Sequence, residues 1–319
     1  MTHPHSQSIE FTGDVSPSRR CVFALDRLVP ALAALWLLGA LLKDRWLVSR
    51  FLYYIPAPGV VVVSLLWLLV RARSASWRNI LLVGLGALIA LAKILAVDFS
   101  WNTPGPTATP PIRIVHWNVW HTRPGIEPVI STLLQDQADI VVLSEPPEGE
   151  DLDRIARAVL PGATPYCVNS VALLCRYPFE DIGGVWFSGG RAWCARIDTP
   201  QGRMLLVGSD IKANPFRDRG VPLDGIAEWV EKQDPSTPIL VIGDFNTPRD
   251  SVHFGAMRRR LENAYEEVGR GWPYTWPVPV PMISIDHAWF NPRVELHSYE
   301  LRSAWCSDHR RQVLEFSLR

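Results

Sequence analysis

The sequence has few cysteines and lacks the spacing that cysteine metal sites need. None of the five cysteines has a partner at Cys-x-x-Cys spacing, which disfavours a zinc or iron–sulfur site. Because cysteine is a good core residue, we expect buried free thiols at Cys167, Cys175, Cys194 and Cys306. One or two disulfides among these four are the alternative if this part of the chain lies outside the cytoplasm.

The chain also lacks net charge, because 32 Lys and Arg balance 32 Asp and Glu. The balance is uneven along the chain: residues 1–98 hold 10 basic against 5 acidic residues, and residues 99–319 hold 22 against 27. A domain that binds a polyanion is usually basic. The acidic second part therefore disfavours a general DNA-binding role.

Charged residues are almost absent from three apolar segments, at 21–42, 51–70 and 80–97. Each is close to the roughly 20 residues that a helix needs to cross a bilayer, and none shows the polar face of a core helix. We predict a membrane domain of three transmembrane helices over residues 21–98, after disordered residues 1–20. A cleaved signal peptide explains the pattern poorly, because no cleavage site is evident.

Basic residues beside these segments predict the orientation of the chain. The N-terminal flank and the second loop carry six arginines, against three basic residues in the first loop: Arg19, Arg20, Arg27, Arg71, Arg73 and Arg78, against Lys43, Arg45 and Arg50. The positive-inside rule then places the N-terminus in the cytoplasm. Three spans of the cell membrane place the remainder on the extracytoplasmic, or periplasmic, side. The Pro-rich residues 99–111 are predicted to be an extended linker.

Residues 112–319 contain more strand patterns than helix patterns. Helices are predicted at 125–137, 151–160, 221–232 and 251–261. Strands are predicted at 112–117, 138–144, near 166, and at 171–175, 182–187, 191–197, 203–211, 239–243, 283–290, 294–302 and 311–318. This mixed order favours an α/β fold of two packed sheets flanked by helices, a four-layer α/β/β/α sandwich.

The strongest single signal is the stretch Ile239-Leu-Val-Ile-Gly-Asp-Phe-Asn246. Four apolar residues predict a buried strand, and Gly243 is expected to break it and let the backbone turn. Asp244 and Asn246 follow, two residues apart, where a turn is the simpler explanation. Polar residues also follow other predicted strands: Asn118, Glu145, Asp210, Asp286, Asp308 and His309. We expect these ends to converge on one site.

Five short motifs carry a resemblance to a known family. They are His116-Trp-Asn118, Leu143-Ser-Glu145, Gly243-Asp-Phe-Asn246, Ile285-Asp286 and Ser307-Asp-His309. In this order, over residues 112–319, they resemble the endonuclease/exonuclease/phosphatase superfamily. Membrane-anchored bacterial members with a Thr-Trp-Pro segment, here Thr275-Trp-Pro277, look most similar. The resemblance implies a catalytic domain that hydrolyses phosphodiester or phosphomonoester bonds with Mg²⁺ or Mn²⁺.

The resemblance implies three residues for the metal. Glu145 matches the main metal ligand of the family, and Asn118 matches the residue that supports the metal and the phosphate. Asp308 is expected to assist the metal or to fix its loop. Carboxylate and amide oxygens are the ligands that such hard cations prefer.

It also implies the groups that act on water and phosphate. Asp244 matches the base that orients or deprotonates the attacking water, and Asn246 matches a donor to the phosphoryl oxygens. His309 matches the group that stabilises the charged pentavalent state. Asp286 matches the carboxylate that orients His309.

One position departs from the family pattern. Many members place a His or Tyr donor where this chain has Asp210, and an ionised carboxylate cannot donate to a phosphate. Asp210 is therefore a candidate metal ligand, and Lys212 or Asn214 is a candidate replacement donor. Arg176 and Arg191 are further candidate phosphate contacts.

The other histidines are expected to be structural or exposed. Strand alternation turns Asp286 away from the isoleucines before it, so His287 is predicted to be packed or exposed. Structural or surface positions are also predicted for His116, His121, His253 and His297, with His121 close enough to Asn118 for a role in the site.

The sequence favours a membrane-tethered, metal-dependent phosphoesterase whose substrate is a lipid head group, another envelope phosphoester or a nucleic acid. No protein partner is predicted. A metal-dependent nuclease is the first alternative, with Trp186, Trp193, Trp272 and Trp276 as candidate base-stacking residues. A catalytically impaired ligand- or partner-binding domain is the second, suggested by Asp210 alone. A transporter is disfavoured, because little charge lies within the spans.

Overall fold

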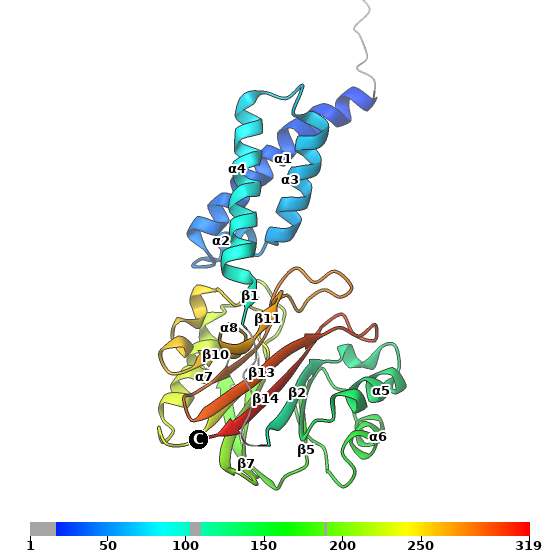
Figure 1. Cartoon of the computed structure of the whole chain (residues 1–319), viewed down its shortest axis with the longest axis vertical. Helices are drawn as coiled ribbons and strands as arrows, with labels where there is room; N and C mark the ends of the chain where they lie inside the picture. The colour runs from blue at the N-terminus through cyan, green and yellow to red at the C-terminus, as the bar shows by residue number, and fades with distance from the viewer. Residues whose placement is uncertain (1–16, 103–109, 188–189) are drawn as a thin grey trace, which may run out of the picture.

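The computed structural model describes residues 17–102, 110–187 and 190–319. Figure 1 shows a bundle of helices standing on one end of an α/β domain. The chain enters at the far end of the bundle, and the α/β domain follows the last helix. The two parts are in direct contact, for example through the hydrogen bond from Lys43 to the carbonyl of Asp250.

Apolar helices form the bundle. They are α1 (Pro17–Leu42), α2 (Leu47–Tyr53), α3 (Ala57–Arg71) and α4 (Trp77–Lys93), which continues into the π-helical turn η1 (Ile94–Asp98). By length and composition, Ala24–Leu42 and Trp77–Asp98 are each able to cross a membrane. The bent pair α2 and α3 raises the number of candidate spans to three.

The prediction of one continuous second helix over 51–70 was wrong. The axes of α2 and α3 differ by 60°. Pro56 lies at the break and precedes the first residue of α3, and the residue before a proline is disfavoured in a helical conformation. The predicted disorder of residues 1–20 was wrong for 17–20, which begin α1, and residues 1–16 lie outside the described part of the chain.

The long helices of the bundle pack side by side (Figure 1). Arg71 at the end of α3 donates through Nε to Asp26 near the start of α1, over 2.8 Å. At the other end of the bundle, the indole of Trp36 in α1 donates to the carbonyl of Ile55 before α3, over 3.2 Å. The start of α1 and the α/β domain therefore lie at opposite ends of the bundle.

Two mixed six-stranded sheets form the centre of the α/β domain. The first has the order β13 (Val294–Arg302), β14 (Arg311–Leu318), β2 (Ile112–Asn118), β3 (Ile140–Ser144), β5 (Val171–Cys175), β4 (Tyr166–Val168). The second has the order β10 (Glu262–Asn263), β12 (Asp286–Phe290), β9 (Ile239–Asp244), β8 (Gly202–Asp210), β7 (Gly190–Thr199), β6 (Phe179–Phe187). Only the β2–β3 and β8–β9 pairs are parallel among the described strands.

Helices cover the outer face of each sheet, so the predicted four-layer α/β/β/α sandwich is confirmed (Figure 1). The first sheet carries α5 (Ile126–Asp136) and α6 (Glu150–Val159), and the second carries α7 (Gly220–Glu231), η3 (Val252–Gly255) and η4 (Met257–Arg259). The short elements η2 (Trp120–Thr122) and α8 (Ala264–Val268) complete the domain. Alternate strand residues such as Ile114, Leu206 and Phe316 fill the space between the sheets.

The predicted helix over 251–261 was wrong, because two short 3₁₀ helices replace it. Ser251 does cap the first, accepting a hydrogen bond from the backbone N–H of His253 over 3.1 Å. The carboxylate of Asp44, from the loop after α1, accepts from the backbone N–H of Val252 over 3.1 Å. This contact from the bundle holds the segment in place, and Gly255 is a poor helix former.

The linker prediction was wrong for residues 99–102. Strand β1 (Ser100–Trp101) pairs with β11 (Arg270–Gly271), and the amide of Asn102 donates to the carbonyl of Glu267 over 2.8 Å. The chain therefore packs on the α/β domain as soon as it leaves η1. Residues 103–109 of the predicted linker lie outside the described residues.

The cysteines of the α/β domain are free thiols in the described structure. Cys175, Cys194 and Cys306 are buried, as predicted, but Cys167 is exposed. Its side chain lies on β4, the edge strand of the first sheet, where only one neighbouring strand covers it.

Candidate active site

Strand register brings the predicted polar residues to one end of both sheets. In the first sheet, Asn118 at the end of β2 lies beside Ser144 at the end of β3, so Glu145 follows directly. In the second sheet, Asp244 at the end of β9 lies between Asp210 of β8 and Asp286 of β12. The carboxyl ends of parallel strands form a natural site in such sheets.

Gly243 acts differently from the prediction. It does not break the strand, because β9 continues through it to Asp244. A Cβ atom at this position would lie 1.9 Å from the backbone oxygen of Ser209 in β8. Glycine therefore permits the close approach of β8 and β9 that places Asp210 beside Asp244. The chain turns only after Asp244, where Asn246 has a φ of 45°.

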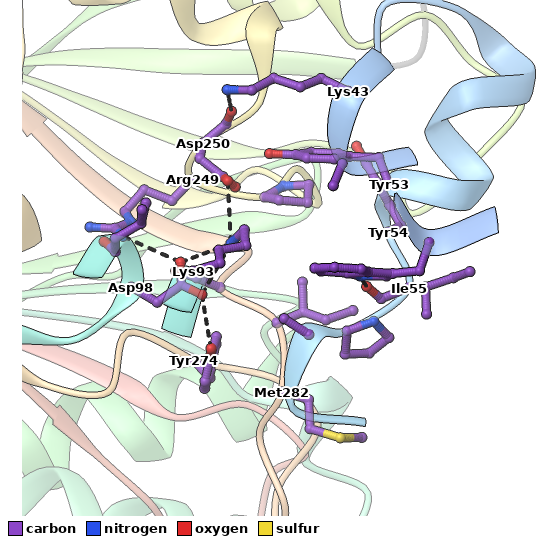
Figure 2. A pocket seen from close by; sticks show the side chains of 18 of the residues that line it. Lys43, Tyr53, Tyr54, Ile55, Lys93, Asp98, Arg249, Asp250, Tyr274 and Met282 are labelled. Carbon is purple, nitrogen blue, oxygen red and sulfur yellow. Dashed lines mark hydrogen bonds and ion pairs between the residues drawn. The ribbon is translucent and has the colours of Figure 1, made fainter. Parts of the chain in front are cut away.

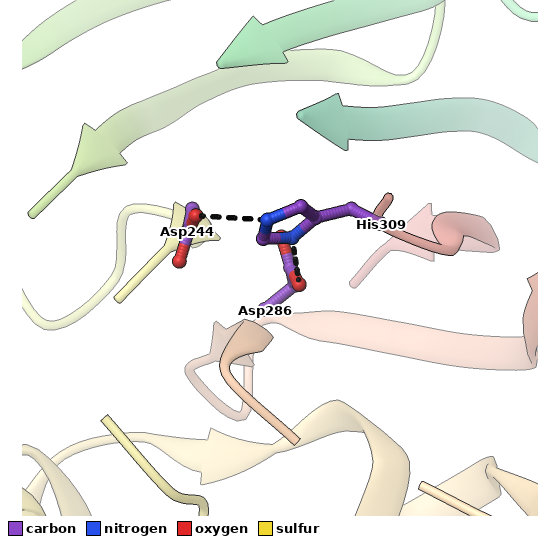
Figure 3. A group of neighbouring side chains, drawn as sticks. All are labelled: Asp244, Asp286 and His309. Atoms are coloured by element: carbon purple, nitrogen blue, oxygen red, sulfur yellow. Dashed lines mark hydrogen bonds and ion pairs between the residues drawn. The ribbon is translucent and has the colours of Figure 1, made fainter. Parts of the chain in front are cut away.

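His309 lies between two buried aspartates (Figure 3). Its Nδ1 is 2.9 Å from Oδ2 of Asp286, and its Nε2 is 3.9 Å from Oδ2 of Asp244. The backbone N–H of His309 donates to Oγ of Ser307 over 2.9 Å, which fixes the loop before β14. Asp286 therefore orients the imidazole so that the opposite nitrogen faces Asp244.

The two carboxylates control the charge of the imidazole. Burial opposes protonation of His309, but the charge and hydrogen bond of Asp286 and the charge of Asp244 outweigh burial and raise the pKa of His309 to about 10. Burial also favours neutral Asp286, yet the charge and hydrogen bond of His309 keep its pKa below the ordinary value. The pair is therefore ionic at neutral pH.

Asp244 has the properties of a base. Burial and the charge of Asp286 raise its pKa well above the ordinary value, while the charge of His309 opposes them. Its Oδ2 accepts from the amide of Asn118 over 3.0 Å, and its Oδ1 accepts from the backbone N–H of Asn246 over 2.9 Å. A carboxylate with a raised pKa takes a proton more readily than an exposed one.

Asn118 and Asn246 are both fixed by hydrogen bonds. The Oδ1 atom of Asn118 accepts from the backbone N–H of Trp120 over 3.0 Å, so its amide points at Asp244. The amide nitrogen of Asn246 donates one hydrogen to the carbonyl of Ile211 over 2.8 Å. An amide nitrogen carries two hydrogens, so Asn246 retains one for a ligand.

Glu145 faces the same cavity from the first sheet. It has a φ of 48°, and its backbone N–H donates to the carbonyl of Ser170 over 2.8 Å. Its side chain is 31% exposed, and Nε2 of His121 lies 3.5 Å from its Oε2. Because no arginine or lysine among the described residues forms an ion pair with Glu145, its carboxylate is available to a cation.

A cavity of about 490 Å³ joins these residues. Its lining includes Glu145, Asp244, Asn246, Asp308 and His309. The Oδ1 atoms of Asp286 and Asp308 are buried without a hydrogen-bond partner among the described residues. Unpaired buried carboxylate oxygens are costly, so this excess of negative charge fits a hard divalent cation.

The cation fits the open carboxylates better than the histidine cluster. Ligand atoms of Asp244, Asp286 and His309 lie within 4.8 Å of one another, a spacing that a metal would allow. A protonated imidazole has no free lone pair, however, and both aspartates hold His309 in that form. Glu145 has no Arg or Lys partner among the described residues, and Oδ1 of Asp308 has no hydrogen-bond partner there, so both carboxylates have an oxygen free for a cation.

Asp210 also belongs to this group of acids. Burial raises the pKa of Asp210 to about 6, and the charge of Glu145 acts in the same direction. A hydrogen bond from Ser170 and the charge of His309 oppose these effects. Asp210 therefore adds a titrating carboxylate beside the proposed metal ligand and supplies no permanent donor.

The remaining candidate substrate contacts do not enter the cavity. Arg176 lies beyond Cys175 at the opposite end of β5 and pairs with Asp139 at 3.1 Å, so the predicted phosphate contact is wrong. Arg191 lies at the correct end of β7, but its guanidinium stacks on the ring of Trp186. Lys212 and Asn214 are exposed on the loop after β8 and do not line the cavity.

Arg219 is a cavity residue that the sequence did not reveal. Its guanidinium donates to the carbonyls of Lys212 over 2.7 Å and of Asn214 over 3.2 Å, and Arg219 lines the cavity together with Asp308 and His309. Arg219 is only 2% exposed. No motif marks it, because the fold of its own loop brings it to the site. It supplies a fixed positive charge to the cavity, close enough to Asp244 for the two charges to interact.

The cavity also takes residues from unexpected elements: Trp120, His121 and Arg123 after β2, Trp276 from the Thr-Trp-Pro segment, and Tyr54 from the break between α2 and α3. The role of Tyr54 has no signal in the sequence, because it lies within an apolar segment nearly two hundred residues from Asp244. Only the packing of the bundle on the α/β domain brings it there.

The other histidines have the structural or surface positions that were predicted, and exposed His121 also lines the cavity. His116 is buried between Ser144 and Gln312, and burial lowers its pKa to about 4. His287 is packed against Phe245 and Phe254. Of the tryptophans, Trp193 is fully buried in the core and cannot stack on a base, whereas Trp276 lines the cavity.

Comparison with known proteins agrees with this geometry. The sequence pattern of the Endonuclease/Exonuclease/phosphatase family matches residues 115–309, which is more than half of the chain. The match begins in β2 and ends at His309, so it spans the strand ends that form the cavity. No curated protein matches the chain in sequence.

Solved structures share the fold at low sequence identity. An endonuclease/exonuclease/phosphatase from Bacteroides vulgatus has a TM-score of 0.54 and 18% identity, covering 66% of this chain and 100% of that chain. TDP2 from D. rerio, complexed with a single strand DNA product, has a TM-score of 0.52 and 14% identity, covering 66% and 100%. The human Nocturnin catalytic domain with bound sulfate has a TM-score of 0.50 and 17% identity, covering 67% and 97%.

Proposed function

The chain belongs to the endonuclease/exonuclease/phosphatase family, and on that premise we propose that it is a membrane-anchored, divalent-metal-dependent phosphoesterase. It hydrolyses phosphodiester or phosphomonoester bonds by attack of an activated water. The observation that carries the proposal is the convergence of Glu145, Asp244, Asn246, Asp308 and His309 on one cavity. These acids and donors match the chemistry of phosphoryl transfer to water.

Glu145 and Asp308 would hold Mg²⁺ or Mn²⁺, with Asn118 close by. When bound, the ion supplies positive charge that polarises the phosphoryl group. Asn118 also holds Asp244 in place through its 3.0 Å hydrogen bond. Asp210 lies near enough to Glu145 for its charge to act there, and it adds negative charge on the side of the cation.

Asp244 takes the proton of the attacking water, because burial and the charge of Asp286 raise its pKa above the ordinary value and make it a better base. Protonated His309 and the free hydrogen of Asn246 donate to the phosphoryl oxygens as negative charge grows on them. Asp286 holds His309 in the charged form and in the required orientation. Arg219 adds a fixed charge beside these donors.

We propose that residues 112–319 face the extracytoplasmic side. Two observations support this orientation. The start of α1 and the α/β domain lie at opposite ends of the bundle (Figure 1), as three passes require. The turn between α3 and α4 carries Arg71, Arg73 and Arg78 and lies at the end of the bundle away from the α/β domain. The positive-inside rule places this end in the cytoplasm.

Hydrolysis assays of the full chain in detergent test the proposed activity. The substrates are sphingomyelin, phosphatidylinositol phosphates, abasic duplex DNA, single-stranded DNA and a generic phosphodiester, each with and without Mg²⁺ or Mn²⁺. We expect turnover that chelation abolishes and that Glu145→Ala lowers by at least a hundredfold. Glu148→Ala, an exposed change three residues later, should have no effect. Turnover of no substrate, or no effect of Glu145→Ala, would contradict the proposal.

A nuclease is the second candidate, favoured by Trp276 in the cavity and by the DNA product bound to the TDP2 structure. An aromatic ring beside the reacting phosphate is able to stack on a base. A nuclease should bind single-stranded DNA with an affinity that falls steeply as salt rises. Binding that is weak and independent of salt would leave the smaller phosphoesters as substrates.

A further inference from the structure

A second cavity, of about 330 Å³, lies where the helical bundle meets the α/β domain (Figure 2). We call it the junction cavity. One part of its wall is apolar and comes from the bundle, through Trp36 and Ala40 of α1, Ile55 before α3 and Ile89 of α4. The other part is polar and carries Lys43, Lys93, Arg249 and Asp250. The cavity therefore has an apolar part and a polar part.

The junction cavity and the active-site cavity are neighbours. Tyr54 and Ile283 line both of them. The hydroxyl of Tyr54 is buried beside Arg219 and Thr247. A side chain shared in this way forms the partition between the cavities. A single molecule that passes Tyr54 would reach from the phosphate-binding groups to the apolar wall of the bundle.

The polar part of the junction cavity is held by ion pairs. The Nζ atom of Lys93 lies 2.9 Å from Oδ1 of Asp98 and 3.3 Å from Oδ2 of Asp250. The Nζ atom of Lys43 donates to the carbonyl of Asp250 over 3.2 Å. These contacts also fasten α1 and α4 to the α/β domain, so the cavity has a fixed shape. Its polar residues lie at the end of the bundle that meets the α/β domain, which would be at the level of the head groups in a bilayer spanned by the bundle.

The apolar part extends into the bundle. Ile89 lies one helical turn before Lys93 in α4 and is therefore farther from the α/β domain along the helix axis. Its side chain is 39% exposed, so the cavity reaches the apolar outer surface of the bundle. In a bilayer this surface is in contact with lipid chains. A hydrocarbon chain is the occupant that matches both the wall and its surroundings.

We propose that the substrate is a lipid phosphoester whose hydrocarbon chain occupies the junction cavity while its phosphate lies in the active-site cavity. The inference rests on the proposed phosphoesterase activity and names its substrate class. The bundle then does more than anchor the enzyme, because it forms half of the substrate-binding surface. Water-soluble phosphoesters lack a group for this surface and are the poorer substrates.

Two phosphodiesters with the same leaving group test the inference: para-nitrophenyl hexadecyl phosphate and para-nitrophenyl methyl phosphate. The full chain is assayed with each diester in the same detergent micelles with Mn²⁺, and released para-nitrophenol reports the rate. The measured quantity is the ratio of kcat/KM for the hexadecyl diester to that for the methyl diester. We expect Ala40→Trp, which fills the junction cavity, to lower this ratio roughly tenfold.

Ile89→Trp is the second cavity variant, at a position exposed enough to accept the larger ring. It should lower the ratio in the same direction. Ala34→Trp is the matched control, because Ala34 is an exposed residue of the same helix α1 that does not line the cavity. Partitioning of the hexadecyl diester into micelles is the same for every variant, so it cancels when the ratios are compared.

The outcomes separate the inference from the activity. If the methyl diester is hydrolysed and both cavity variants keep the ratio of the unmodified protein, the lipid-chain site is refuted and the phosphoesterase remains. An equal fall in the ratio with Ala34→Trp would also refute it, because the effect would not belong to the cavity. If neither diester is hydrolysed with any metal, the proposed activity and the inference fail together.

Discussion

His309 and Asp286 form a buried hydrogen bond of 2.9 Å that joins the loop before β14 in one sheet to the start of β12 in the other. Neither side chain is more than 7% exposed. The contact crosses the space between the two sheets at the site, so it sets both the charge of the imidazole and the separation of the sheet ends. Several predictions about pH and rate depend on it.

Replacing Asp286 with asparagine should remove the charge that keeps His309 protonated. We expect kcat to fall by roughly a hundredfold. The alkaline limb of the pH–rate profile should move from about 10 toward the ordinary histidine value of 6.5, because the raised pKa of His309 depends on Asp286. Asp234→Asn, an exposed change, is the control. An alkaline limb that stays in place would contradict the role of Asp286.

The same pKa predicts how stability depends on pH. The pKa of His309 is about 10 in the folded chain, above 6.5 for an ordinary histidine, so folding favours the protonated form. Its stabilisation is complete below pH 6.5 and is lost as the pH rises toward 10. Thermal unfolding across this range should show a steeper fall in Tm for the unmodified protein than for His309→Gln. Parallel curves would argue against the ion pair.

For Asp210, the ionised form destabilises the folded chain, so Asp210→Asn should raise the stability at high pH. The pKa of Asp210 is about 6 when folded and 3.8 ordinarily, so its ionisation above pH 6 costs folding free energy. Asparagine should therefore stabilise the chain at pH 8 by about 3 kcal/mol, with the gain vanishing below pH 4. Chemical unfolding of the metal-free protein at both pH values measures it. Equal stability of the two proteins at pH 8 would show that Asp210 is not under electrostatic strain.

Arg219→Lys should weaken phosphate binding. Lysine has a single nitrogen in place of the two guanidinium nitrogens that bind the carbonyls of Lys212 and Asn214, so both the loop and the positive charge would move. We expect KM for a soluble phosphodiester to rise by about tenfold or more, with a smaller change in kcat. Arg217→Lys is the matched control, because Arg217 is exposed on the same loop. Identical kinetics for both variants would exclude a role for Arg219.

Gly243→Ala should disturb the site through the backbone. The added methyl group would lie 1.9 Å from the oxygen of Ser209, so β8 and β9 must separate. We expect a loss of about 2–4 kcal/mol in the free energy of unfolding and a loss of activity, measured by chemical denaturation and turnover. Gly255→Ala, which meets open space, is the matched control. A variant as stable as the control would contradict the close approach.

Local pattern was enough to predict most of the α/β domain. The apolar runs at β3 and β9 were found because buried strands read as continuous apolar segments, and the polar residues after them stand out. The segment at 251–261 was misread, since its conformation depends on Asp44 from a distant loop. The break between α2 and α3 was overlooked although Pro56 marks it.

The sequence alone determined which chemical groups end the strands and in what order, because residue type and alternation are local properties. From these came the fold and the set Asn118, Glu145, Asp244, Asp286 and His309. Tertiary structure decided what surrounds them. The family resemblance already implied that Asp286 orients His309, but the entry of Arg219 and the contribution of Tyr54 from the bundle join segments far apart in the chain. Such contacts depend on packing between layers, which no local pattern encodes.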